Sequence, residues 1–158
     1  MSLLLHIDTS ADRASLCLSD EEEVLDLVFN EARNDHATWL HPAIDRMIKK
    51  HGRPLSALEA VSVSIGPGSY TGLRIGLSAA KGICYALNIP LLTISTLKMI
   101  AAASVKEAKG LVCPLIDARR MEVYAAVYDK QLTEITAPHA MILDKEGFSS
   151  LLQGLAHQ

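Results

Sequence analysis

The sequence predicts an α/β fold in which one module occurs twice. Strands and helices alternate through the first 105 residues, in the order strand, strand, strand, helix, strand, helix, strand, helix, which is typical of a sheet with helical crossovers. Residues 111–130 also align without gaps under residues 2–21, as an internal repeat would; a chance likeness of two β-hairpins is the alternative interpretation. We therefore predict a complete first half over 1–105 and an incomplete second half over 106–158.

Composition excludes several classes of protein. The chain has 158 residues, of which 49% are hydrophobic, and a formal net charge of −3, so it can bury a core and is unlike a disordered chain. Its apolar runs are shorter than the ~20 residues of a membrane span, and its first residues lack the basic region of a signal peptide. A pI near 6 indicates no basic surface for nucleic acid. We expect a cytoplasmic protein whose three cysteines are buried thiols, not a disulfide or zinc site.

Local hydrophobicity predicts the first three strands. Leu3–Ile7 is a continuous apolar run, as a buried strand is. Ala14–Ser19 alternates between apolar and small or polar residues, which is typical of a half-buried strand. The acidic turn Asp20–Glu23 and the run Val24–Phe29 then complete an antiparallel meander.

The rest of the first half is predicted to form two helical crossovers between strands of the sheet. Apolar residues recur at helical spacing within Asn34–Lys50, and Pro42 requires that this helix begin near Thr38 or bend at the proline. The later predicted elements are the strands Ala60–Ile65 and Pro90–Ile94, the helices Tyr70–Leu87 and Thr96–Ser104, and Leu132–Thr136 as a third strand of the second half.

The segment Gly66–Leu77 is the most informative motif, and three interpretations compete. A phosphate-binding loop needs G-x-x-x-x-G-K-[ST] or G-x-G-x-x-G, but Gly72 comes one residue too late and no lysine follows it. A nucleophile elbow, G-x-S-x-G, fails because no glycine stands two residues from Ser69. The third is a tight turn, Gly66-Pro67-Gly68-Ser69, whose glycines tolerate positive φ and whose Ser69, or else Thr71, caps the next helix.

A row of small residues follows on that helix. Gly72, Gly76 and Ala80 are spaced by four and lie on one side of the helix. A helical glycine costs about 1 kcal/mol relative to alanine, so the row suggests another backbone packed very close. That backbone is either a core strand of this chain or a helix of another chain, and the spacing does not choose between them.

Four segments together carry a resemblance to a known family. They are Ile7-Asp8-Thr9-Ser10, Gly66–Gly76, Ser95-Thr96-Leu97, and Ile116-Asp117-Ala118-Arg119 with Glu122-Val123-Tyr124. On these the chain resembles the TsaB (YeaZ) family over nearly its whole length. The resemblance implies an actin-like ATPase (ribonuclease H-like) duplicated fold, of which the first half is complete and the second truncated.

The resemblance also implies a function and partners. Such proteins are non-catalytic subunits that bind and activate the paralogue TsaD, and with TsaE they transfer a threonylcarbamoyl group to the adenosine beside the tRNA anticodon. A homodimer when isolated, and contact with tRNA only through partners, are expected. The implied partner interface lies on two helices and comprises Trp39, Leu40, Ile44, Met47, Gly72, Leu73, Gly76, Leu77 and Ala80.

The titratable residues suggest no catalytic site of the chain's own. His36 and His41, the closest histidine pair, are five residues apart and so roughly 140° apart on a helix, which is poor for one metal ion. A ribonuclease H-like nuclease needs three or four clustered carboxylates, whereas Asp8 alone ends a strand of the first half.

Nucleotide binding is the remaining alternative. Asp8-Thr9-Ser10 resembles the first phosphate loop of actin-like ATPases, but the matching turn Asp117–Met121 contains no glycine, so side chains would keep a phosphate away. We expect a vestigial phosphate loop in which Asp8 caps its own turn, no cofactor held by this chain alone, and ATP only at a shared interface of the complex. An actin-like-fold ATPase or small-molecule kinase is the competing hypothesis.

Overall fold

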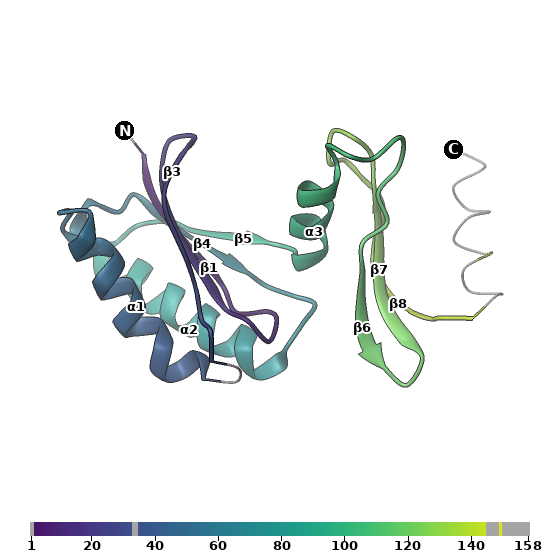
Figure 1. Cartoon of the computed structure of the whole chain (residues 1–158), viewed down its shortest axis with the longest axis horizontal. Coiled ribbons are helices and arrows are strands. Elements are labelled where there is room, and N and C mark those ends of the chain that lie inside the picture. Colours follow the sequence, from purple (N-terminus) through teal and green to yellow (C-terminus); the bar gives the residue numbers. More distant parts are fainter. Residues whose placement is uncertain (1, 33–34, 145–148, 150–158) are drawn as a thin grey trace. The chain divides into compact units, whose positions relative to one another are not determined.

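The computed structural model describes residues 2–32, 35–144 and 149. It divides into two compact units, Met1–Thr96 and Leu97–Gln158 (Figure 1). The division falls nine residues before the predicted end of the first half at residue 105, because helix α3 (Thr96–Ser104) belongs to the second core. Leu97 and Ala101 are fully buried there and pack with residues of the later strands.

The first unit is built on a five-stranded sheet. Its strands are β1 (Leu3–Asp8), β2 (Ser15–Asp20), β3 (Glu23–Phe29), β4 (Ala60–Ser64) and β5 (Leu91–Ile94). The order in space is β3-β2-β1-β4-β5. Strands β1, β2 and β3 pair antiparallel, whereas β4 and β5 are parallel to β1. The predicted meander followed by two crossovers is therefore confirmed.

Two helices, α1 (His36–Lys50) and α2 (Tyr70–Leu87), lie side by side on one face of this sheet (Figure 1). The bounds of α2 agree with the prediction, and α1 begins two residues before Thr38, with Pro42 inside it. A short 3-10 helix, η1 (Leu55–Ala57), precedes β4. Alternate residues of β1 and β2, such as Leu5 and Leu16, are fully buried beneath the helices.

The second unit contains an antiparallel sheet in the order β6-β7-β8. Its strands are β6 (Leu115–Arg119), β7 (Glu122–Tyr128) and β8 (Glu134–Ile142). The predicted third strand, Leu132–Thr136, begins too early, because Leu132 has a left-handed φ of 60° in a turn closed by Asp129. That carboxylate accepts hydrogen bonds from the backbone N–H groups of Gln131 and Thr133. Within the described residues, no helix is long and apolar enough to cross a membrane.

Candidate functional site

The turn between β4 and α2 fastens the helix to the loop that follows β1. A Cβ added at Gly68 would lie 2.3 Å from the carbonyl oxygen of Ser10, so only glycine fits there. The backbone N–H of Ser69 donates to that same carbonyl at 2.7 Å, and the Ser69 hydroxyl accepts a hydrogen bond from the N–H of Gly72. Of the two predicted capping residues, Ser69 is the one that caps α2.

The polar groups of the loop Asp8-Thr9-Ser10 form hydrogen bonds within the chain. Asp8 Oδ1 accepts hydrogen bonds from the Ser10 N–H at 3.0 Å, the Ser10 hydroxyl at 2.7 Å and the Ser64 hydroxyl at 2.6 Å. The Thr9 hydroxyl donates to the carbonyl of Gly72 at 2.7 Å. Asp8 thus caps its own turn and ties the end of β1 to the end of β4 and, through Thr9, to α2.

The turn between β6 and β7 has an unusual backbone. Arg119, Arg120 and Met121 have φ values of 70°, 54° and 62°, and left-handed conformations cost residues other than glycine roughly 1 kcal/mol or more each. The N–H of Arg119 donates to Asp117 Oδ1 at 2.7 Å. All three side chains of the left-handed run are exposed, so bulky side chains occupy the outside of this turn.

The small residues Gly72, Gly76 and Ala80, here called the inner row, face the chain's own sheet. A Cβ on Gly72 would lie 2.0 Å from the carbonyl oxygen of Thr9, and one on Gly76 would lie 2.2 Å from the Thr9 hydroxyl. Ala80 is fully buried. Of the two partners that the spacing allowed, the core strand is correct, and the expectation that the inner row meets another protein is corrected.

The apolar stripe of α1 is likewise used within the fold. Leu40, Ile44 and Met47 are buried in the core of the first unit, so their predicted role in a partner interface is also corrected. The physical reason is that an amphipathic helix covers its own sheet first. Trp39 is only half-buried, and it stays a candidate contact residue.

Leu73 and Leu77 of α2 share this intermediate state. Both side chains are half-buried; Leu77 packs against the core, and the Leu73 side chain lies close to Gly66. Their predicted contact with a partner stays a prediction.

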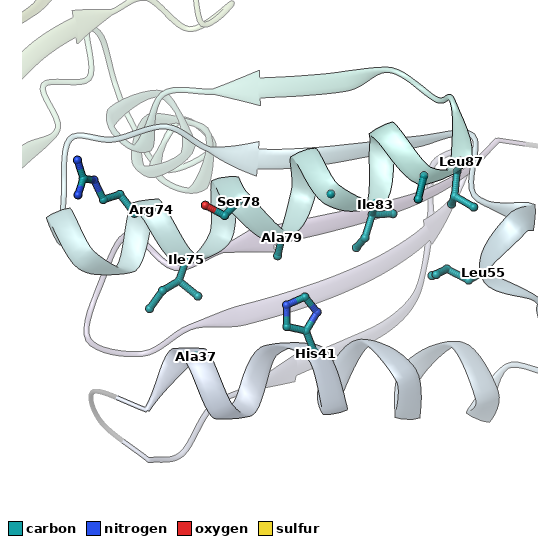
Figure 2. Close-up of a pocket in the computed structure, with 11 residues that line it drawn as sticks. Ala37, His41, Leu55, Arg74, Ile75, Ser78, Ala79, Ile83 and Leu87 are labelled. Carbon is teal, nitrogen blue, oxygen red and sulfur yellow. The ribbon is translucent and has the colours of Figure 1, made fainter.

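The solvent side of the two helices forms a groove that the sequence analysis did not find (Figure 2). It has a volume of about 600 Å³ and is mostly apolar. His41 projects from α1 toward α2, while Arg74 and Leu87 lie toward opposite ends of the groove. Its lining residues are Ala37, His41, Leu55, Arg74, Ile75, Ser78, Ala79, Gly82, Ile83, Ala86 and Leu87.

A second row of small residues, Ser78, Gly82 and Ala86, here called the outer row, forms part of the groove wall. It has the same spacing of four as the inner row, which is the signal that could have revealed it. A Cβ on Gly82 would meet nothing within 4 Å, so no residue that the structure describes requires a glycine there. Tyr85, on the same helix, is 92% exposed.

The histidines and cysteines of the first unit occupy separate environments. His36 is buried and its Nε2 lies 2.9 Å from the carbonyl oxygen of Ala11, whereas His41 is exposed in the groove. Cys17 is half-buried and Cys84 buried, and burial raises the pKa of each thiol. No group of three His, Cys, Asp or Glu side chains that could hold a metal ion occurs in the part of the chain described.

The third cysteine departs from the sequence prediction. Cys113, in the second unit, is exposed rather than buried, because it lies in the connection between α3 and β6 and not in a core element. Desolvation still raises the pKa of its thiol, which does not favour the reactive thiolate.

Asp26 forms the main charged cluster of the first unit. Its carboxylate lies 3.0 Å from Lys50 Nζ and 3.2 Å from His51 Nε2, and its side chain is 10% exposed. The hydrogen bond from Lys50 lowers the pKa of Asp26, with a smaller contribution from His51. The cluster joins β3 to the end of α1 and thereby neutralises one of the cations of that helix.

Comparison with known proteins decides the family. Residues 27–147 match the family described as "TsaD: tRNA N6-adenosine threonylcarbamoyltransferase". The structure matches "YeaZ from Pseudomonas aeruginosa" with a TM-score of 0.83 and 30% identity, covering 92% of this chain and 70% of that one. The chain belongs to the TsaB (YeaZ) family. The match to YeaZ confirms the predicted α/β fold class.

Curated members of the TsaB family agree. "tRNA threonylcarbamoyladenosine biosynthesis protein TsaB" from Bacillus subtilis is 34% identical over 79% of this chain and 54% of its own length. The protein of that name from Escherichia coli is 32% identical over 80% of this chain and 55% of its own length. This TsaB-family chain therefore spans about half the length of the curated relatives it matches.

Proposed function

We propose that this chain is an accessory subunit in the formation of threonylcarbamoyladenosine in tRNA. In this proposal it binds and activates TsaD, which transfers the threonylcarbamoyl group to the adenosine beside the anticodon, while TsaE acts as a further partner. The names of the curated TsaB relatives support a place in this biosynthesis. The chain itself supplies no catalytic residue and touches tRNA only through its partners.

The observation that carries the proposal is the groove between α1 and α2. It is mostly apolar and open along the solvent side of both helices (Figure 2). Tyr85 of α2 is 92% exposed. Tyrosine is enriched where proteins bind one another, because it buries a large surface and keeps a polar tip. A helix with its apolar face toward the groove is the kind of partner that such a surface fits.

The proposed contact residues replace those that the fold has buried. In place of the inner row and the core-facing side chains of α1, the partner would meet the outer row together with His41, Ile75 and Ile83. The outer row leaves room for a partner backbone to approach closely, since none of the described side chains fills the space at Gly82.

Two features support a role without independent ATP chemistry. Asp8 and Thr9 are committed to hydrogen bonds with Ser10, Ser64 and Gly72, so the first phosphate-loop segment serves as a tie between elements. The turn at 117–121 has no glycine and carries exposed arginines, which does not resemble a backbone cradle for a phosphate. In this proposal ATP binds only at an interface shared with the partners.

The proposal is tested by reconstitution. Threonylcarbamoyl transfer to tRNA is measured with TsaD and TsaE, with and without this chain, and we expect the rate to rise at least tenfold when the chain is present. The Gly82→Leu variant should lose most of this stimulation, and Gly110→Leu, a change at another open glycine, should keep it. An unchanged rate would overturn the proposal.

Calorimetric titration of the chain alone with magnesium and ATP tests the competing hypothesis. We expect no heat of tight binding. Micromolar binding or better, together with steady ATP turnover by the isolated chain, would favour an actin-like ATPase or small-molecule kinase instead.

A further inference from the structure

Strand β3 is an edge strand that lacks the usual protection against pairing. It lies at one end of the five-stranded sheet and, among the described strands, pairs with β2 alone. Natural edge strands are commonly blocked by lysine, by proline or by a very short length. Strand β3 has seven residues and contains neither lysine nor proline, whereas β5, at the other edge of the same sheet, has only four residues.

The backbone groups of Leu27 and Phe29 point away from the sheet. The N–H of Asn30 donates to the carbonyl of Ala14, next to β2, and in an antiparallel ladder the groups of alternate residues point to the same side. Since those of Asn30 point toward β2, those of Leu27 and Phe29 point outward. The N–H of Leu27 agrees with this direction, because it donates to the carboxylate of Asp26 at 3.1 Å and not to a strand.

Large apolar side chains accompany this open edge. Val24, Leu27 and Phe29 are 60%, 50% and 44% exposed. They pair with residues of β2 that alternate with the buried Leu16 and Leu18, so all three lie on the face of the sheet opposite to the helices. An exposed apolar edge strand is a template on which another strand pairs.

The helix side of the same edge borders a cavity. It has a volume of about 220 Å³ and is lined by residues of β3 and α1, among them Asp26, Val28 and Trp39. The side chains of an added strand alternate between the two faces of a sheet. One set would enter this cavity, and the other set would join the exposed apolar side chains, so the edge has room for a strand on both faces.

We infer that β3 pairs with β3 of a second copy of this chain, antiparallel and across a two-fold axis. The pairing sets Val28 opposite its own counterpart and Leu27 opposite Phe29 of the second copy. Because Leu27 and Phe29 both direct their N–H and C=O groups outward, about four backbone hydrogen bonds form, two for each such pair. An aromatic side chain opposite an aliphatic one also stabilises the pairing.

This dimer closes and leaves other surfaces free. A two-fold axis sets the same surface of both copies together, so no further copy can add at β3. The open edge is separate from the groove between α1 and α2, whose lining residues include none of β3. The inference therefore does not rest on the proposed function.

Charge selects this register from its neighbours. A register that sets Asp26 opposite its own counterpart would place two carboxylates side by side, and one that sets Leu27 opposite itself would place Glu23 opposite Glu31; like charges in such positions destabilise a sheet. In the inferred register Asp26 comes opposite Asn30 of the second copy. The amide nitrogen of Asn30 is buried and has no hydrogen-bond partner among the described residues, so the second copy brings an acceptor to a donor that lacks one.

Sedimentation of the intact chain between about 5 and 500 μM tests the pairing. We expect a monomer–dimer equilibrium whose dissociation constant rises at least tenfold in Leu27→Lys, because a lysine on an edge strand blocks pairing. The control, Leu92→Lys, makes the same change at a 45% exposed residue of β5 and should stay within about twofold of the wild type. Urea midpoints show that both variants fold. A chain that is monomeric at 500 μM, or equal losses in the two variants, would overturn the inference.

The Gly82→Leu variant separates this dimer from one formed through the helices. It fills the groove between α1 and α2, which Gly82 lines, and should leave self-association unchanged. If Gly82→Leu abolishes the dimer and Leu27→Lys does not, the copies meet through the helices and the inference is wrong.

A cysteine at position 28 tests the register without disturbing the apolar edge. Opposed residues that exchange no hydrogen bonds have Cα atoms about 4.5 Å apart, which suits a disulfide. In a Cys113→Ser background, which removes the exposed native thiol, Val28→Cys should form an intermolecular disulfide with oxidised glutathione at least tenfold faster than Val24→Cys. Val24 is the more exposed of the two but meets no thiol in this register. An equal or faster reaction of Val24→Cys would overturn the inference.

Discussion

The two rows of small residues on α2 share a spacing and differ in everything else. At Gly72 and Gly76 of the inner row, an added Cβ would lie within 2.2 Å of an atom of Thr9. At Gly82 of the outer row, an added Cβ would meet nothing within 4 Å. The inner row is thus required by the fold, and the outer row is not.

This difference teaches how to separate stability from recognition on one helix. At Gly72 and Gly76, atoms of Thr9 occupy the space that a side chain would need, so close packing within the fold accounts for both glycines. An exposed helical glycine destabilises its helix by about 1 kcal/mol relative to alanine, and no packing contact within the fold offsets that cost. Changes in the inner row should therefore alter stability, and changes in the outer row should alter binding.

The largest effect is expected at Gly72. Gly72→Ala would place a methyl group 2.0 Å from the backbone carbonyl of Thr9, and that carbonyl belongs to the loop that anchors α2. We expect a loss of about 3 kcal/mol in the free energy of unfolding, measured by urea denaturation. A variant with the wild-type midpoint would show that the inner row is not closely packed.

The next effect concerns binding alone. Gly82→Leu should lower the affinity for TsaD at least tenfold, because a branched side chain would fill the groove where a partner is proposed to approach. Its free energy of unfolding should not fall, since leucine is a better helix former than glycine. Calorimetry with TsaD and urea denaturation measure the two quantities, and Gly110→Leu is the matched control. Unaltered affinity would count against the groove.

A smaller substitution reverses the sign of the stability change. Gly82→Ala should raise the free energy of unfolding by about 0.5–1 kcal/mol, because the position is helical and the added methyl group meets nothing. Gly76→Ala, six residues earlier on the same helix, should lower it, since its methyl group would meet the Thr9 hydroxyl at 2.2 Å. If both substitutions shift the urea midpoint in the same direction, the contrast between the rows is wrong.

The smallest expected effect is a pH dependence of stability that arises from His6. His6 lies in β1, the strand whose end the inner row contacts, and burial lowers its pKa. Below about pH 6.5 the unfolded chain binds a proton that the folded chain resists. The stability present above that pH is therefore lost as the pH falls.

The measurement for this prediction is the urea midpoint between pH 7.5 and 5.5. Replacement of His6 by glutamine, which can keep a hydrogen bond to the Ser19 hydroxyl now 2.8 Å from Nε2, should reduce the slope of that midpoint with pH. An equal slope in His6→Gln would assign the pH dependence to other groups.

Much of the fold could be predicted because its signals are local. Apolar runs and alternation located β1, β2 and β3 to within about one residue, and the Gly66–Ser69 turn located the start of α2. Strand β8 was mislocated because most of its residues are exposed. A strand that buries little shows little periodicity, so its limits depend on hydrogen bonds to β7.

The candidate site was harder to predict. The apolar residues of α1 were expected to contact a partner, but they pack against the chain's own sheet. Leu40, Ile44 and Met47 are spaced as any amphipathic helix requires, and spacing does not say what covers the stripe. The groove residues gave a weak signal, since alanine, serine and glycine on a helix surface are common.

By itself the sequence determined that α2 is a helix, where it begins and ends, and that small residues recur on it every four positions. These follow from backbone propensities and the helical repeat, which act over a few residues. Only the tertiary structure decided which row lies against Thr9 and which faces solvent. The rotation of a helix about its axis is set by contacts with distant strands, and here the tie from Thr9 to Gly72 spans 63 residues.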